Sequence, residues 1–310
     1  AAAAGADAVK LQTYTADTMT LDLDSEAFVI TDPSSPWHGR TLYDLYQEAH
    51  TPWEWHEPIF RRCRDRALIG FSSVFDESAV EFLESLDAPC FKIASFENTD
   101  LRLIARAAQT GKPLMISTGM ATAAEVGEMV EAARAGGCTS LILLKCTSTY
   151  PASPADSHLR TIQYMREVFR CEVGLSDHTI GVGAAVAAVA LGATVVEKHL
   201  TLDRADGGVD ASFSADPVEF RLLVTETRRA WEAVGRVHLE PTEAERTSRA
   251  HRRSLYIISD LRAGDTLTRE NVRAIRPGHG LAPKFLDLVL GRRIRRNAKK
   301  GTPLQWEMID

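Results

Sequence analysis

The sequence predicts a (β/α)8 barrel in which seven strands are visible, followed by a smaller C-terminal domain. Short apolar runs alternate with segments of helical periodicity, which is typical of a barrel or of a doubly wound sheet. Several runs are apolar at nearly every position, as parallel strands buried on both faces are. Nearly all of them end in polar residues, and no Gly-rich dinucleotide loop follows any of them. Polar ends around the whole sheet favour a closed ring of active-site loops, because an open sheet gathers its ligand groups at one switch point.

The predicted strands are short apolar runs, and the predicted helices have apolar residues spaced by three and four. The strands are Ala8–Tyr14, Leu68–Phe75, Cys90–Phe96, Pro113–Gly119, Leu141–Thr147, Cys171–His178 and Thr194–Leu200. The helices are Glu54–Arg66, Glu77–Asp87, Asp100–Gln109, Ala123–Ala135, His158–Phe169, Val182–Leu191 and Asp216–Gly235. Residues Ala1–Gly5 resemble the tail of a helix, so we expect an initial strand and most of its helix to be absent. An open seven-stranded sheet is the alternative.

The character of the chain changes after the predicted barrel domain, residues 1–235. Residues 236–253 are charged and poor in apolar residues, which indicates a linker. Residues 254–310 contain short strands such as Leu255–Ser259, glycine-containing turns and basic stretches. A segment of this length can form a small domain of marginal stability. We expect it to dock against the barrel of the same chain or of a partner chain.

The composition is that of an ordinary globular protein, with 45% hydrophobic and 25% charged residues among 310. A net charge of −6 argues against a general nucleic-acid binder, although a few lysines in a cleft still permit an anionic substrate. Five cysteines without a CxxC pair indicate buried thiols in a reducing compartment. No apolar stretch reaches the ~18 residues of a membrane span, and no secretory signal is visible. We therefore expect a cytoplasmic protein without nucleic-acid or membrane partners.

Two histidines lie at the ends of the last two predicted strands of the barrel. His178 lies in the strand end Gly174–Thr179, and His199 lies in the strand end Val195–Leu200. Neighbouring parallel strands lie about 4.8 Å apart, so the two imidazoles can converge on one ion. A metal with only two protein ligands keeps open positions, which suggests catalysis rather than a structural site. The alternative is that each histidine is simply hydrogen-bonded at the barrel rim.

Lysines and hydroxyl groups gather at the other strand ends. They are Lys10, Gln12, Ser72, Ser73, Lys92, Ser95, Glu97, Ser117, Thr118, Lys145, Thr147 and Ser148. Several lysines around one ring can hold a phosphate or a carboxylate. The alternative is that each lysine pairs with a rim carboxylate such as Asp7, Glu97 or Asp177. The hydroxyl groups among them favour anion binding.

A further polar and aromatic group, Thr51–His56, lies between the first two visible strands. Its two tryptophans, glutamate and histidine could form a platform that faces a sugar. They could equally be a hydrophobic staple at the start of the helix Glu54–Arg66. The residues alone leave both interpretations open.

Six ordered motifs together resemble the sialic acid synthase family, whose enzymes make nine-carbon keto sugar acids from phosphoenolpyruvate. The motifs are Ala8–Thr13, Lys92–Glu97, Ile116–Met120, Cys146–Pro151, Gly174–Thr179 and Glu197–Thr201. The tail is similar to the antifreeze-protein-like SAF domain that closes these enzymes, with Arg276–Gly278 as its signature loop. The sequence Lys92–Glu97 and the Thr51–His56 insertion look most like the pseudaminic acid synthase branch.

The resemblance implies a role for each matching residue. His178 and His199 match metal ligands, for Mn²⁺ or Mg²⁺, and count with Glu97 as the catalytic residues. Positions that hold phosphoenolpyruvate are Lys10, Ser73, Lys92, Ser95, Ser117 and Ser176. Positions around the sugar are Gln12, Tyr150, Asp210 and Arg276, with Glu97 beside them. Family members are typically domain-swapped homodimers in which this arginine reaches the partner's active site.

The resemblance therefore implies a transferase that condenses phosphoenolpyruvate with an open-chain amino sugar and water. For the pseudaminate branch the sugar is 2,4-diacetamido-2,4,6-trideoxy-L-altrose, and the products are pseudaminic acid and phosphate. The metal would act as a Lewis acid on the sugar aldehyde. The alternatives are an N-acetylneuraminate or legionaminate synthase, a related synthase of seven- or eight-carbon keto acids, and a non-catalytic carbohydrate-binding scaffold for surface polysaccharide assembly.

Overall fold

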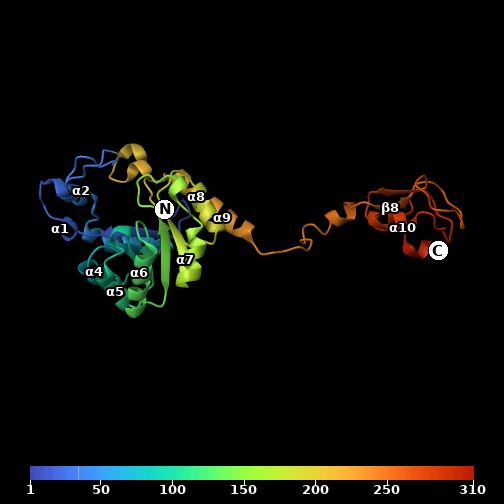
Figure 1. Ribbon diagram of the computed structural model, residues 1–310. Coiled ribbons are helices and arrows are strands. Elements are labelled where there is room, and N and C mark those ends of the chain that lie inside the picture. The colour runs from blue at the N-terminus through green and yellow to red at the C-terminus, as the bar shows by residue number, and fades with distance from the viewer. Residues whose placement is uncertain (34) are drawn as a thin grey trace. The chain divides into compact units, whose positions relative to one another are not determined.

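The computed structural model describes residues 1–33 and 35–310, and it divides into two compact units (Figure 1). The first unit is Ala1–Gly235 and the second is Arg236–Asp310. Residues 236–253, the predicted linker, are exposed at every position. No helix among the described residues is long and apolar enough to cross a membrane.

The first unit contains one sheet of seven parallel strands that pair in the order of the sequence. The strands are β1 (Ala8–Thr13), β2 (Ile69–Val74), β3 (Phe91–Ile93), β4 (Leu114–Ser117), β5 (Leu141–Cys146), β6 (Glu172–Asp177) and β7 (Val196–Lys198). Each lies inside an apolar run that the sequence predicts as a strand. The structure ends the strands earlier than the apolar runs end, because the polar residues that follow turn away into loops.

An ion pair between the first and last strands shows that this sheet is curled. In a flat sheet, strand spacings of about 4.8 Å would place β1 and β7 roughly 29 Å apart. Instead, the Lys10 ammonium on β1 lies 3.0 Å from a Glu197 carboxylate oxygen on β7. The prediction of a barrel is thereby confirmed, and the alternative of an open, flat sheet is wrong. The two edge strands are mostly half-buried, and no ladder hydrogen bonds join them in the described part of the chain.

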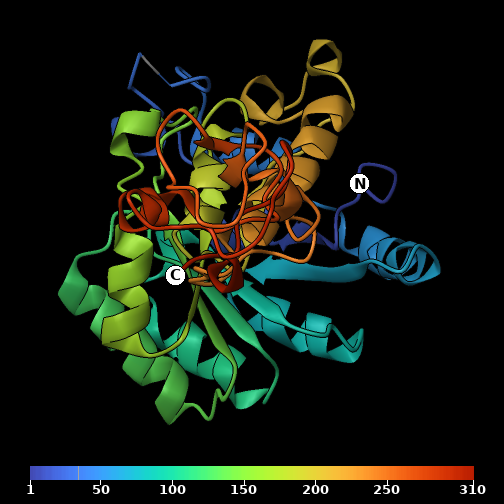
Figure 2. The same ribbon diagram turned by 90° about the vertical axis from the view of Figure 1, so that its right-hand side faces the viewer.

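Helices cover the outer face of the sheet (Figures 1 and 2). They are α3 (His56–Asp65), α4 (Glu77–Ser85), α5 (Leu101–Gln109), α6 (Ala123–Ala135), α7 (Thr161–Phe169), α8 (Gly183–Ala190) and α9 (Pro217–Val234). The short helices α1 (Ala16–Met19) and α2 (Leu42–Ala49) lie in the insertion between β1 and β2. Several of these helices have a side-chain cap at the N-terminus. At α6, Thr122 and Glu125 form a capping box. Residues Ala1–Gly5 form hydrogen-bonded turns rather than an α-helix.

The core of the first unit lies between the sheet and these helices. Its fully buried side chains include Phe91, Ile93, Leu103, Ile104, Leu114, Ile116, Met129 and Leu143. Burial of such side chains contributes about 1.5–3 kcal/mol each before the entropy of ordering is counted. The strands are therefore held from outside, which leaves their inward residues available for a polar site.

The second unit has its own small core and an antiparallel strand pair. Strand β8 (Ser254–Ile257) pairs with β9 (Val272–Ile275), and α10 (Leu286–Val289) follows. The core is formed by Leu255, Ile257, Leu267, Val272, Val289, Ile294 and Leu304, among others. Arg276 directly follows β9 and its side chain is exposed.

Candidate active site

The inward face of the barrel carries most of the sequence-predicted site residues. Side chains alternate along a strand, and paired residues of neighbouring strands point to the same face. Gln12, Ser73 and Lys92 form one continuous row of paired residues across β1, β2 and β3. Ser176 and Glu197 form another pair, on β6 and β7. The predicted residues therefore come from different strands but share one interior.

Glu197 is the residue on which the inward lysines converge. Lys10 lies 3.0 Å from its carboxylate and Lys92 lies 3.9 Å from it. The Ser176 hydroxyl donates a 2.9 Å hydrogen bond to the same oxygen. Burial alone would raise the pKa of Glu197. The two ammonium groups and the hydrogen bonds from Lys10 and Ser176 have the larger, opposite effect, so the pKa lies well below its usual range. Glu197 is thus a permanently charged anchor for two cations.

The interior nevertheless carries an excess of positive charge. Lys92 is 1% exposed, and burial lowers its pKa to about 8, with Glu197 opposing the shift, so it is mostly protonated at neutral pH. Lys145 pairs with Leu175 of the outer core and so points away from this interior, and it donates to the Cys146 carbonyl oxygen at 2.8 Å. Lys10 and Lys92 against the one charged Glu197 form a site suited to an anion. The alternative that each lysine has its own rim carboxylate is wrong for this cluster.

Two buried hydroxyl groups of the interior have no hydrogen-bond partner among the described residues. The buried Ser73 and Ser117 hydroxyls make no hydrogen bond within the described structure. Buried polar atoms without partners are rare in proteins and need an explanation, such as a ligand. Ser95 accepts a 3.2 Å hydrogen bond from the backbone N–H of Gly119. A Cβ on Gly119 would lie 2.7 Å from the Ser95 hydroxyl and 2.1 Å from that of Ser148, so only glycine fits there.

Glu97 differs from Glu197 in its electrostatic surroundings. It lies in the 3-10 turn Ser95–Glu97, directly after β3, and one of its oxygens is buried without a hydrogen-bond partner. Burial raises its pKa to about 7, although its own backbone N–H and Lys92 act in the opposite direction. A carboxyl group of this kind can take up or release a proton at neutral pH.

Replacing Glu97 by glutamine should change how stability depends on pH. The folded-state pKa of about 7 exceeds the ordinary value of 4.5, so the native state binds the proton more tightly than the unfolded state does. Glu97 therefore contributes stability below pH 4.5 that is lost as pH rises to about 7, by about 3 kcal/mol. We expect this loss to be absent in Glu97→Gln. Urea unfolding of both proteins between pH 4 and 8 measures it.

An exposed glutamate of the same domain provides the control for this prediction. Glu81 lies on the exposed side of α4, and Glu81→Gln should follow the wild-type pH dependence of the free energy of unfolding. A Glu97→Gln profile that runs parallel to the wild-type profile across this pH range would contradict the assigned state of Glu97.

The structure brings the two predicted histidines together. The ring centroids of His178 and His199 are 5.5 Å apart. His178 Nδ1 lies 2.9 Å from the Thr147 carbonyl oxygen, to which it donates. His199 Nδ1 lies 3.3 Å from a carboxylate oxygen of Asp210. Both Nδ1 atoms therefore face acceptors, which leaves the Nε2 lone pairs for another partner.

This arrangement fits a divalent cation held by two imidazoles. An outer carboxylate or carbonyl on Nδ1 is the usual support for a metal-ligating histidine. In residues 1–33 and 35–310, no group of three His, Cys, Asp or Glu side chains is arranged to hold a metal. A cation here would thus keep several positions for substrate oxygens and water, as a catalytic metal does.

An aromatic cluster lies against the histidines. Tyr150 has its ring centroid 4.5 Å from that of His178, and Phe213 lies 5.2 Å from both Tyr150 and His199. Trp37 contacts Tyr150 and Phe213, and its indole N–H donates to the Val209 carbonyl oxygen at 2.9 Å. Burial strongly raises the pKa of Tyr150, so its hydroxyl stays protonated. The site thus has a charged side and an aromatic side.

The tryptophan-rich insertion is mostly used for packing. Trp53 stacks on Phe82 with centroids 4.6 Å apart. His56 is fully buried and lies 2.7 Å from the Thr13 hydroxyl. The packing interpretation therefore holds for Trp53 and His56. Trp55 is exposed and no contact ties it to the interior described above.

Family and structural comparisons agree with this arrangement. The NeuB family model matches residues 1–238, and the SAF domain model matches residues 252–310. The chain belongs to the NeuB family. Pseudaminic acid synthase of Campylobacter jejuni is 42% identical over 302 residues, which cover 97% of this chain and 88% of that protein. Pseudaminic acid synthase of Helicobacter pylori is 40% identical, with coverages of 99% and 90%.

A solved structure extends the likeness to three dimensions. The N-acetylneuraminic acid (sialic acid) synthetase of Leptospira borgpetersenii superposes with a TM-score of 0.70 at 29% identity. It covers 80% of this chain and 81% of that one. The resemblance to the sialic acid synthase family is thereby confirmed, and the C-terminal segment of this NeuB-family chain matches the SAF domain as the sequence predicts.

Sequence reasoning missed one central residue of the NeuB-family site. Glu197 appears only within a motif, although it binds Lys10 and Lys92. The spacing could have indicated it. Glu197 and His199 are two residues apart, so Glu197 points to the same side of the chain as the predicted metal ligand. Cys146 was likewise expected only as a buried thiol, yet its sulfur lies 3.9 Å from His178 Nδ1.

Proposed function

We propose that this chain is a pseudaminic acid synthase. It condenses phosphoenolpyruvate with open-chain 2,4-diacetamido-2,4,6-trideoxy-L-altrose and water, and releases pseudaminic acid and phosphate. The observation that carries the proposal is the combination of the lysine cluster with its unpartnered serines beside the histidine pair. The similarity to two pseudaminic acid synthases across nearly the whole chain supports this sugar over others.

Phosphoenolpyruvate would occupy the charged side of the interior. Lys10 and Lys92 carry charge opposite to that of its phosphate and carboxylate. The free hydroxyls of Ser73 and Ser117 can donate to the same oxygens. Ser95 and Ser176 complete the proposed set. Such a site contributes to the rate chiefly by positioning and by electrostatics.

The sugar would lie on the side of the histidines and the aromatic cluster. Gln12, Tyr150 and Asp210 are the proposed polar contacts from this chain. His178 and His199 would hold Mn²⁺ or Mg²⁺, which supplies Lewis-acid polarisation of the aldehyde when bound. This places the aldehyde carbon opposite the bound phosphoenolpyruvate.

Carbon–carbon bond formation then joins the two substrates. C3 of phosphoenolpyruvate adds to the aldehyde carbon, and C2 becomes electron-poor. Water adds to C2, and phosphate leaves with cleavage of the C2–O bond as the added oxygen becomes the keto oxygen. Of the two protons that the water loses, one ends on the former aldehyde oxygen and one on phosphate. Glu97, with a pKa of about 7, is the carboxyl group available to take up a proton of that water. The lysines stabilise the departing phosphate.

Two further features belong to the same proposal. We place the enzyme in the cytoplasm, where phosphoenolpyruvate is made. We also propose a domain-swapped homodimer in which the partner's Arg276 reaches the sugar. The exposed position of Arg276 after β9 is compatible with that role.

Product analysis with three sugars tests the proposed function. The protein is incubated with phosphoenolpyruvate, Mn²⁺ and one sugar, and the product mass and released phosphate are measured. We expect the altrose derivative to be turned over at least about 100-fold faster, in kcat/KM, than N-acetylmannosamine or the 2,4-diacetamido sugar of legionaminate synthesis. A site that hydrogen-bonds particular substituents can discriminate to this extent.

Each rival predicts a different result in this assay. A neuraminate or legionaminate synthase would prefer its own sugar. A synthase of seven- or eight-carbon keto acids would release phosphate with none of the three sugars but would do so with a shorter aldose phosphate, which is therefore added as a fourth substrate. A carbohydrate-binding scaffold would release no phosphate with any of the four, and that result would overturn the enzymatic proposal as a whole.

A further inference from the structure

A buried ion pair lies directly behind the histidine pair. Asp177 and Lys198 are the last paired residues of β6 and β7. The Lys198 ammonium lies 2.7 Å from an Asp177 carboxylate oxygen, and the two side chains are 4% and 1% exposed. Ser176 and Glu197 point into the barrel, so Asp177 and Lys198, one residue later, point outward. This pair is not part of the substrate interior described above.

Each member of the pair immediately precedes a histidine. His178 and His199 lie one residue beyond the last rung of the β6–β7 ladder. No pairing of the two strands continues past that rung in the described structure, so the ladder alone does not set the distance between the rings. The Asp177–Lys198 ion pair closes the ladder at the point from which both imidazoles project.

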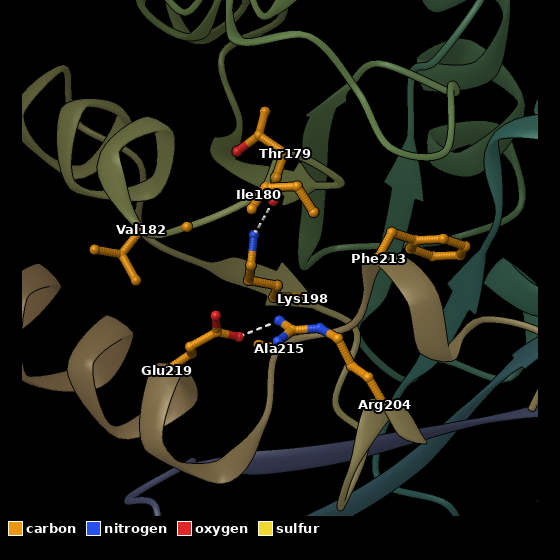
Figure 3. Close-up of a pocket in the computed structure, with 9 residues that line it drawn as sticks. Thr179, Ile180, Val182, Lys198, Arg204, Phe213, Ala215 and Glu219 are labelled. Atoms are coloured by element: carbon orange, nitrogen blue, oxygen red, sulfur yellow. Dashed lines mark hydrogen bonds and ion pairs between the residues drawn. The ribbon is translucent and has the colours of Figure 1, made fainter. Parts of the chain in front are cut away.

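The ion pair also holds the backbone on the far side of His178. Lys198 donates to the Thr179 carbonyl oxygen at 2.6 Å. The second Asp177 oxygen accepts from the Thr179 N–H at 2.9 Å and from its hydroxyl at 2.8 Å. His178 therefore lies between two residues that are both tied to Lys198. Figure 3 shows the Lys198 side chain reaching toward Thr179 at the edge of a small cavity.

Other residues around that cavity hold the chain after His199. The Ala215 N–H donates to the His199 carbonyl oxygen at 2.9 Å. Arg204 donates to the Ser214 carbonyl oxygen at 2.9 Å and forms an ion pair with Glu219, as seen in Figure 3. The chain beside each histidine is thus held from the outer side by polar contacts of residues that line this cavity.

We propose that Asp177 and Lys198 are positioning residues that set the separation and direction of His178 and His199. They touch neither substrate nor cation, and they act through the two imidazoles. The proposal rests on the proposed function in one respect, namely that the imidazoles bind a divalent cation. Its consequence is that the ion pair controls the affinity for Mn²⁺ and, through it, kcat.

The test measures Mn²⁺ binding without substrates. Isothermal titration with Mn²⁺ alone is carried out on wild type and on Asp177→Leu/Lys198→Met, which removes both charges and leaves no unpaired buried ion. We expect the Kd for Mn²⁺ to rise 10- to 100-fold, as for other groups that orient metal ligands. With saturating Mn²⁺, kcat should fall while KM for phosphoenolpyruvate changes less than about twofold, because the lysine cluster is untouched.

A more exposed ion pair with similar contacts provides the control. Lys112 lies 2.7 Å from Asp87 and donates to the Ala88 carbonyl oxygen at 2.7 Å, as Lys198 does to Asp177 and Thr179, but Asp87 is exposed. Lys112→Met should leave Mn²⁺ binding unchanged. If it weakens binding as much as the double variant does, the effect is general and the proposal is wrong.

A milder variant keeps the test decisive if the double variant does not fold. Asp177→Glu retains both charges but is one methylene longer, and we expect it to fold and to bind Mn²⁺ several-fold more weakly. Wild-type affinity in every variant that folds would overturn this inference alone. Wild-type protein that binds no Mn²⁺ would overturn the proposed metal and this inference together, while the sugar assay above judges the remaining function separately.

Discussion

His199→Ala should lose metal-dependent turnover while keeping its fold. The substitution removes one of the two imidazoles that face each other at the end of β6 and β7. Lewis-acid catalysis contributes several kcal/mol, so we expect kcat to fall about 10³-fold or more. The remaining activity should be the same with Mn²⁺ and with a chelator. Phosphate release measured under both conditions, together with thermal unfolding of the metal-free protein, tests this.

An unrelated histidine gives the comparison. His50 caps α2, and its Nδ1 lies 2.7 Å from the Gln47 carbonyl oxygen, so it resembles His178 in its local hydrogen bond. His50→Ala should retain full metal-dependent activity. A fully active His199→Ala protein would contradict the assignment of the histidine pair as the metal site.

Lys92→Met should raise the KM for phosphoenolpyruvate by about 10- to 100-fold. A hydrogen bond to a charged group contributes about 1.5–3 kcal/mol, and methionine has a similar shape without the charge. Lys10 continues to pair with Glu197, so the glutamate is not left alone. Replacing a fully buried lysine by an apolar residue should not lower the melting temperature. Steady-state kinetics at fixed sugar concentration provide the measurement.

The pH profile adds a second signature of the same residue. Burial lowers the pKa of Lys92 to about 8, so its positive charge is lost as pH rises through that value. We expect wild-type kcat/KM for phosphoenolpyruvate to fall above pH 8, and the corresponding fall to be missing in Lys92→Met. Lys299→Met, which removes an exposed lysine that pairs with Asp260, should behave like wild type. An unchanged KM in Lys92→Met would refute the proposed anion site.

Period-two alternation explains why much of this site was predictable. Lys10 and Gln12 share one face of β1, and Ser73 and Lys92 continue the row on the next two strands. Once the strands are recognised from their apolar runs, the polar residues near their ends must meet at one mouth. The helices were predictable for a similar reason, as α6 (Ala123–Ala135) shows by matching the predicted range at both ends.

Contacts between distant strands were not predictable in the same way. The polar strand ends indicated a closed ring, but which residues of the first and last strands meet depends on the sum of many small twists, and no single residue encodes it. The meeting of Lys10 with Glu197 therefore becomes visible only in three dimensions. The stacking of Trp53 on Phe82 is of the same kind, because a tryptophan at a helix start can face either a ligand or the neighbouring helix.

The bond between Lys10 and Glu197 also has a consequence for how the domain gains its stability. It joins the two edge strands, which lie at opposite ends of the domain's sequence and have no ladder between them. Such long-range contacts require the closure of a long loop, which is entropically costly. The anion site should therefore be among the last parts to form during folding. Phosphoenolpyruvate bound there at 100 times its Kd would add about 2.7 kcal/mol to the folded state. Bound substrate would thus stabilise the closed arrangement in which the two edge strands lie together.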